Sequence, residues 1–186
     1  MRSVCAFALL ISAALSTPST LSEGARCYAN TPRTASHILN AIASRDSSAG
    51  VELSSIESLE DECFTEINRL RRSHNRQPLE FSERLREVAR DYSRRMAEER
   101  FFSHTDPEGR GIRDRVNAAG IRWKSLGENI ATSRGYTNPV AVSVHGWMES
   151  EGHRANILSS RFNQTAVGVW ISRNGTVYFT EIFLRR

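Results

Sequence analysis

Apolar side chains recur at helical spacing through the middle of this chain. The first run consists of Leu59, Cys63, Phe64, Ile67 and Leu70. It predicts a helix that ends before Pro78, because proline cannot continue a helix. The second run, with Ser82 as its expected N-cap, consists of Leu85, Val88, Ala89, Tyr92 and Met96. These five side chains share one helical face, so we expect that face to pack against a core.

Two shorter helices are predicted further along the chain. The first follows Asp106-Pro107 and ends at Gly120, and its inward positions are Ile112, Val116 and Ala119. The second has Asn138 as its N-cap and Pro139 in its first turn, and its apolar positions are Val140, Val144 and Trp147. Both have the start and stop residues that are typical of helices.

The period changes from 3.6 to 2 in the last segment. Apolar residues alternate at Val167, Val169 and Ile171, and alternation resumes at Val177, Phe179, Glu181 and Phe183. The Asn174-Gly175 dipeptide between the two runs predicts a β-hairpin with a type I′ turn. Helices followed by a hairpin predict an α+β domain in which helices pack on a small sheet.

The N-terminal residues are typical of a signal peptide. Arg2 precedes an apolar stretch from Val4 to Leu15, which is shorter than the ~20 residues of a membrane span. We therefore expect a signal peptide over 1–22, cleaved after residue 16 or 22, a Ser/Thr/Ala-rich segment over 23–58 and a domain over 59–186. The expected location is extracellular or periplasmic, and the alternative is a cytosolic protein with an apolar N-terminus.

Cysteine positions agree with secretion. Cys5 lies inside the expected signal peptide, which leaves Cys27 and Cys63 as a pair. A disulfide between them is the simplest outcome in an oxidising compartment, and the alternative is two free buried thiols.

Charge adds little about partners. Lys and Arg outnumber Asp and Glu by 25 to 21, a formal net charge of +4. Arg86, Arg90 and Arg94 of the second predicted helix face away from its apolar side and have acidic neighbours three or four residues away. We interpret this face as solvated and salt-bridged rather than as a groove for polyanions, and we expect no nucleic-acid binding.

The common catalytic and nucleotide-binding motifs are absent, including HExxH, GxSxG, the P-loop and GxGxxG. Three polar clusters remain, around residues 101–104, 127–130 and 147–154. They contain His104, Glu128 and His153. Two histidines and a carboxylate can bind a divalent metal or share protons near neutral pH, but only the fold can bring these three together.

The clusters FFSHTDPEG, GENIA and WMESEGHRANIL occur in the same order as in the CAP superfamily of cysteine-rich secretory, antigen 5 and pathogenesis-related proteins. The resemblance runs from Cys63 to Leu184 and is strongest to the bacterial secreted branch. It implies an α-β-α sandwich with a central antiparallel sheet flanked by helices. It also implies a solvent-open cleft with two histidines and two acids, whose histidines bind zinc or another divalent ion in some members.

The resemblance assigns site residues one by one. His104 and His153 match the family histidines and are the expected metal ligands, and Glu128 matches the first acid. Ser150 stands where other members have the second acid. Helical angles place Ser150 at the margin of the buried stripe, whereas Glu149 and His145 face solvent. We therefore expect His104, Glu128, Ser150 and His153 to line the cleft.

Three functions are compatible with these residues. The first is a secreted, monomeric, non-enzymatic binding module for a divalent metal, a small apolar ligand or a cell-envelope component. The second is a metal-dependent hydrolase or peptidase, in which His104 and His153 hold the ion and Glu128 polarises a water. The third is an interaction domain that uses its Arg-rich surface against anionic envelope polymers or another protein. We favour the binding module, and an enzyme least.

Overall fold

The computed structural model describes residues 49–186, with side chains from Ser55 onward. The expected signal peptide, residues 23–48 and Cys27 lie outside the described residues. In the described part, no helix is both long and apolar enough to cross a membrane.

Five helices and four strands make up the described chain. The helices are α2 (Ala49–Ser73), α3 (Glu83–Glu98), α4 (Ile112–Ala118), α5 (Pro139–Glu149) and α6 (Glu151–Ile157). The strands are β1 (Glu80–Phe81), β2 (Ser125–Ser133), β3 (Gln164–Ile171) and β4 (Val177–Arg185). They form one sheet in the order β1-β3-β4-β2, which confirms the α+β class.

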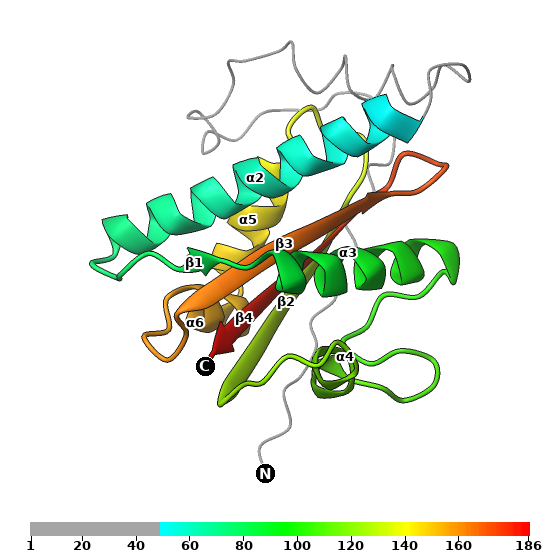
Figure 1. The fold of residues 1–186 in the computed structure, drawn as a ribbon. Coiled ribbons are helices and arrows are strands. Elements are labelled where there is room, and N and C mark those ends of the chain that lie inside the picture. Colours follow the sequence, from blue (N-terminus) through cyan, green and yellow to red (C-terminus); the bar gives the residue numbers. More distant parts are fainter. Residues whose placement is uncertain (1–48) are drawn as a thin grey trace.

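The helices form a layer on each face of the sheet (Figure 1). Helices α2, α5 and α6 cover one face, where the core includes Cys63, Trp147 and Val169. Helices α3 and α4 cover the other face, where Leu85 and Val116 pack against Ile182. Successive residues of β3 point to opposite layers, because side chains alternate along a strand. The predicted α-β-α sandwich is therefore confirmed.

The sheet is mixed rather than wholly antiparallel. Strands β3, β4 and β2 pair antiparallel, and the two residues of β1 pair parallel with Gln164 and Thr165 of β3. The antiparallel sheet that the resemblance implies is correct for the three long strands, and β1 adds a parallel edge.

Local signals fix several helix ends as expected. Asn138 caps α5, with its Oδ1 accepting a hydrogen bond from the Ala141 N–H at 2.8 Å, and Pro139 begins the helix. Gly120 follows α4 with a φ of 65°, a conformation that glycine adopts without strain. Helix α2 differs from the expectation, because it begins at Ala49, before the apolar run that starts at Leu59.

The predicted hairpin is present, but its predicted type I′ turn is wrong. A type I′ turn needs positive φ at both central residues, and of Asn174 and Gly175 only Gly175 has it, at 79°. The Gly175 N–H instead donates to the Ser172 carbonyl oxygen, and the Ser172 hydroxyl donates to Oδ1 of Asn174. The turn is therefore wider than two residues, and side-chain hydrogen bonds hold it.

Helix α3 lies unusually close to β3 at Gly168. A Cβ atom on Gly168 would overlap the Arg90 backbone nitrogen and the Ala89 carbonyl carbon. The Ser93 hydroxyl donates to the Gly168 carbonyl oxygen at 2.8 Å. The helix backbone therefore rests on the strand backbone, and only glycine fits.

Arg90 also departs from its expected place on a solvated face. Its guanidinium group forms a bidentate ion pair with the buried Glu60 of α2, at 2.8 and 2.5 Å. Glu60 Oε1 also accepts a hydrogen bond from the Val169 N–H of β3. This carboxylate therefore joins α2, α3 and β3. Arg94 pairs with Asp91 and Glu98 of its own helix, as expected. Arg86 pairs with Glu83 of its own helix at 2.6 Å and also lies 3.9 Å from Glu60 and from Asp61 of α2.

Substituting Gly168 with alanine should destabilise the protein by about 3 kcal/mol, because the new methyl group overlaps the α3 backbone. Gly146→Ala on α5 is the matched control. Apart from its chain neighbours and the backbone of its own helix, no heavy atom lies within 4 Å of the Cβ that this substitution adds. It should stabilise by about 0.5–1 kcal/mol through helix propensity. Urea unfolding measures both, and equal effects of the two substitutions would contradict the close contact.

Candidate functional site

The site forms around two consecutive residues of β2, the strand at the sheet edge. Glu128 Oε1 lies 2.8 Å from Nδ1 of His104, in the loop after α3. The Asn129 side-chain amide donates to the His153 carbonyl oxygen of α6 at 3.2 Å. Consecutive strand residues point to opposite faces, so Glu128 and Asn129 each contact a segment of a different layer. The GEN motif thus connects both layers at the sheet edge.

The two histidines approach each other beside this strand. Their ring centroids are 6.3 Å apart with an angle of 44° between the planes. The His104 side chain is 32% exposed, so solvent reaches the pair. Burial and the neighbouring His104 lower the pKa of His153 below its usual 6.5, which keeps its ring neutral at pH 7. The structure therefore brings together His104, Glu128 and His153, although long stretches of sequence separate them.

Arg115 of α4 completes the surroundings of Glu128. Its guanidinium group donates to Glu128 Oε2 at 2.5 Å and lies over the Tyr92 ring, with its Cζ 3.3 Å from the ring centroid. The Tyr92 hydroxyl donates to the Ser103 carbonyl oxygen, next to His104. Both oxygens of Glu128, whose side chain is only 3% exposed, are thus engaged. The sequence did not indicate a role for Arg115, because its position in the helix pattern is that of an ordinary polar residue of a short helix.

Neighbouring polar groups hold the α6 side of the site. The Asn156 amide donates to the Glu128 carbonyl oxygen and to Oδ1 of Asn129. A Cβ on Gly127 would lie 2.8 Å from the Phe162 ring, so the strand backbone approaches that ring closely at Gly127. At Gly152 there is no such close approach, since an added Cβ would have no heavy atom within 4 Å.

The remaining expected site residues have different positions. Ser150 lies between α5 and α6, and its hydroxyl does not cap α6. Glu149 and His145 are exposed, as their helical angles predict. Trp147 is buried, and its indole N–H donates to the Ile130 carbonyl oxygen, as expected of a core residue.

Cys63 is a fully buried thiol. Its expected partner, Cys27, lies outside the described residues, so the disulfide stays a prediction.

A buried acid, Glu181 of β4, lies on the face of the sheet that α2 covers, opposite Asn129 of β2. Glu181 is fully buried, and its oxygens accept hydrogen bonds from the Thr165 hydroxyl at 3.3 Å and the Asn129 amide at 3.5 Å. Burial raises its pKa to about 8. Glu181 is therefore mainly protonated at pH 7, and through Asn129 it connects to the segment that carries His153.

A metal ion at this site would require ligands from its polar side chains, usually three or four of them. In the part of the chain with described side chains, no group of three or more His, Cys, Asp or Glu residues is placed to hold a metal ion. The two imidazoles remain as a pair of nitrogen atoms that could act as ligands.

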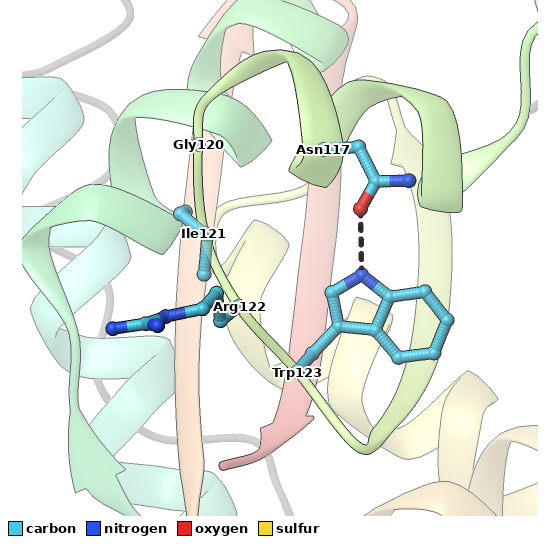
Figure 2. Close-up of a pocket in the computed structure, with 5 residues that line it drawn as sticks. All are labelled: Asn117, Gly120, Ile121, Arg122 and Trp123. Carbon is cyan, nitrogen blue, oxygen red and sulfur yellow. Dashed lines mark hydrogen bonds between the residues drawn. The ribbon is translucent and has the colours of Figure 1, made fainter.

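A distinct hollow lies elsewhere, at the loop between α4 and β2. It is lined by Asn117, Gly120, Ile121, Arg122 and Trp123 (Figure 2).

The proximity of the two histidines can be tested by NMR titration of their ring protons. His153 should titrate below pH 6.5, and His104→Gln should raise its pKa partway toward 6.5, because one of the two causes of the shift is removed while burial remains. His145→Gln on exposed α5 is the control and should leave His153 unchanged. A His153 pKa at or above 6.5 would contradict the geometry.

Glu181 should make the stability of the protein depend on pH. Its pKa is about 8 in the folded state and near 4.5 in the unfolded chain, so the folded state holds the extra proton between these values. The free energy of unfolding should therefore fall as pH rises from about 4.5 to 8, by up to about 1.4 kcal/mol per pH unit. Glu181→Gln should remove most of this slope. Urea unfolding across the range measures it, and identical slopes in both proteins would refute the buried acid.

Comparison with known proteins agrees with this architecture. Residues 64–183 match the cysteine-rich secretory protein family, CAP. The uncharacterized protein YkwD of Bacillus subtilis is 35% identical over 131 residues, which cover 70% of this chain and 49% of YkwD. The uncharacterized membrane protein YlbC of the same organism is 34% identical over 119 residues, 64% of this chain and 32% of YlbC. The matched region thus spans about half of YkwD and a third of YlbC.

Solved structures show the same fold. An extracellular protein containing an SCP domain from Bacillus anthracis superposes with a TM-score of 0.68 at 26% identity, covering 77% of this chain and 45% of that one. An outer surface protein from Borrelia burgdorferi has a TM-score of 0.62 at 21% identity, covering 68% of this chain and 91% of that one. The match over most of residues 59–186, together with the sandwich and the order of its motifs, leads to one assignment. This chain belongs to the CAP family of cysteine-rich secretory proteins.

Proposed function

We propose that the protein is a secreted, non-enzymatic binding module that holds a divalent cation between His104 and His153. One observation carries this proposal: the two rings lie 6.3 Å apart, and a buried carboxylate fixes the orientation of His104. The apolar stretch from Val4 to Leu15 supports secretion. So do the descriptions of the two structural relatives as extracellular and outer surface proteins.

Hydrogen bonding prepares His104 for coordination. In the neutral ring, Nδ1 donates its proton to Glu128, which leaves the lone pair of Nε2 available to a metal. Burial and the neighbouring His104 lower the pKa of His153, which favours the neutral form of that second ring. A divalent cation would be held by one nitrogen of each ring, and its open positions would accept oxygen atoms of a ligand.

The small donor set predicts modest affinity. A structural zinc site has four protein ligands, and this pair supplies two. The chain carries Ser150 where the family resemblance implies a second acid, and a neutral hydroxyl attracts a cation less than a carboxylate does. Arg115 further offsets the charge of Glu128.

The alternative functions have less support. A hydrolase needs a general base, and both oxygens of Glu128 already accept hydrogen bonds from His104 and Arg115. A ligand held by apolar contacts needs apolar surface, and among the described residues Phe81 is the exposed large hydrophobic side chain. Arg86, Arg90, Arg94 and Arg95 of α3 are paired with carboxylates, so the part of that helix that they cover is a poor surface for anionic polymers.

Calorimetric titration of the full chain with Zn²⁺ and Co²⁺ tests the proposal. At pH 7.5 the wild type should bind, and at pH 5.5 binding should weaken, because protonated imidazoles cannot coordinate. His104→Ala and His153→Ala should each weaken binding at pH 7.5 by about tenfold or more, and the double variant should abolish it.

His145→Ala and His74→Ala serve as controls, because both residues are exposed histidines outside the pair. Neither should change the affinity. Thermal melts establish that each variant is folded. Absence of binding in the folded wild type, or equal binding by the double variant, would overturn the metal proposal.

A further inference from the structure

Four basic side chains of α3 are each paired with a carboxylate: Arg86, Arg90, Arg94 and Arg95. A second group surrounds the loop between α4 and β2, is exposed, and has no ion pair with any residue from 55 to 186: Arg84, Arg113, Arg122, Lys124 and Arg185. Positive charge that no carboxylate offsets therefore surrounds this loop.

The same loop forms the hollow of Figure 2. Its volume is about 480 Å³, which is in the range of small-molecule sites. Asn117, Gly120, Ile121, Arg122 and Trp123 line it, so no carboxylate does. Arg84 borders it, because its guanidinium group donates to the Ala119 carbonyl oxygen at 2.6 Å. The Lys124 N–H donates to the Arg185 carbonyl oxygen, which places these two basic residues side by side.

Trp123 provides a flat apolar surface in this basic environment. Its ring is partly exposed, and its indole N–H donates to Oδ1 of Asn117 at 2.9 Å. The Asn117 amide nitrogen points away from the indole in Figure 2, and it forms no hydrogen bond within the described part. The Arg113 guanidinium group lies 5.7 Å from the centre of the ring. We call the face made by Arg113, Asn117 and Trp123 the Trp123 surface; the Arg122 side chain extends from the other side of the loop in Figure 2 and flanks this surface.

Helix α4 separates this surface from the histidine pair. Arg113 and Asn117 are four residues apart and share one helical face, whereas Arg115 lies between them in sequence and points to Glu128. The two sites therefore occupy opposite sides of one helix. Substitutions on the Trp123 surface can be made without touching the contacts of His104 and Glu128.

The chemistry of the Trp123 surface selects one class of ligand. Guanidinium groups without carboxylate partners favour an anion, and a partly exposed indole beside a free amide donor suits a sugar ring that carries hydroxyl groups. The flanking Arg84, Lys124 and Arg185 extend the charge beyond a single ring, which favours a polymer. Grooves for single-stranded nucleic acid stack several aromatic rings, whereas here one ring is available.

We propose that the Trp123 surface binds an acidic polysaccharide. A carboxylate group of the polymer pairs with Arg113, one sugar ring lies against the indole of Trp123, and Asn117 donates a hydrogen bond to a hydroxyl group. A carboxylate further along the polymer pairs with the flanking Arg122. This binding is independent of the divalent cation, since no contact of the histidine pair is used.

Tryptophan fluorescence and calorimetry of the full chain with polygalacturonate test the proposal. Binding should weaken with added salt and be absent for neutral dextran. Arg113→Gln/Arg122→Gln should reduce the affinity about five- to tenfold, as expected for two solvent-exposed charge contacts. The control Arg69→Gln/Arg94→Gln removes the same charge elsewhere, from residues paired on α2 and α3, and should change the affinity less than about twofold.

Two further probes separate sugar recognition from charge alone. Trp123→Ala should weaken binding to polygalacturonate. Asn117→Asp keeps the side-chain size and adds a negative charge, so it should also weaken this binding, and it provides a second test if Trp123→Ala does not fold. Polyglutamate, an acidic polymer without sugar rings, should bind at least about fivefold more weakly than polygalacturonate, because it cannot stack on the indole. Equal weakening by both arginine pairs, equal affinity for polyglutamate, or tighter binding to single-stranded DNA or to phosphatidylglycerol vesicles would each overturn the proposal.

Discussion

The backbone contact between α3 and β3 at Gly168 is the constraint on which the arrangement depends. It fixes how close α3 lies to the sheet and therefore where Tyr92, two residues after Arg90, meets the neighbouring loop. The Tyr92 hydroxyl holds the Ser103 carbonyl oxygen, and the Tyr92 ring supports Arg115. His104 follows Ser103, and Arg115 binds Glu128. The absence of a side chain at Gly168 of β3 thus influences the position of His104 at the site.

At the candidate site, hydrogen bonds hold the side chains around the two histidines in fixed orientations. Glu128 is buried, accepts hydrogen bonds from two sides and has no free oxygen, so its contribution is to orient His104. The Asn129 and Asn156 amides hold the strand against α6, which carries His153. On the proposal that a cation binds here, little rearrangement would be needed, since the hydrogen bonds are already formed. The proposed binding would then be reversible rather than a permanent incorporation of a metal.

Amphipathic periodicity was sufficient to predict the helices and the hairpin, because each buries one face against the sheet. Strand β2 escaped prediction, because Glu128, Asn129 and Ile130 are buried in succession and no alternation is visible. Both polar residues are buried because partners from different layers satisfy them, and a sequence does not show such partners. The bidentate partner of Arg90 is 30 residues away and Gly168 meets a helix much earlier in the chain, so local patterns could reveal neither.

The Glu60 carboxylate also occupies part of the outer edge of β3, where a strand of another molecule could pair with the sheet. Strand β1 covers only Gln164 and Thr165, so most of the outer edge of β3 has no strand beside it. An open edge of this kind invites pairing with another chain and is a common starting point of aggregation. Glu60 accepts the Val169 N–H at that edge and places a buried ion pair across it. A charged side chain thereby satisfies an edge N–H group that an added strand would otherwise pair with, and it places a charge where such a strand would have to lie.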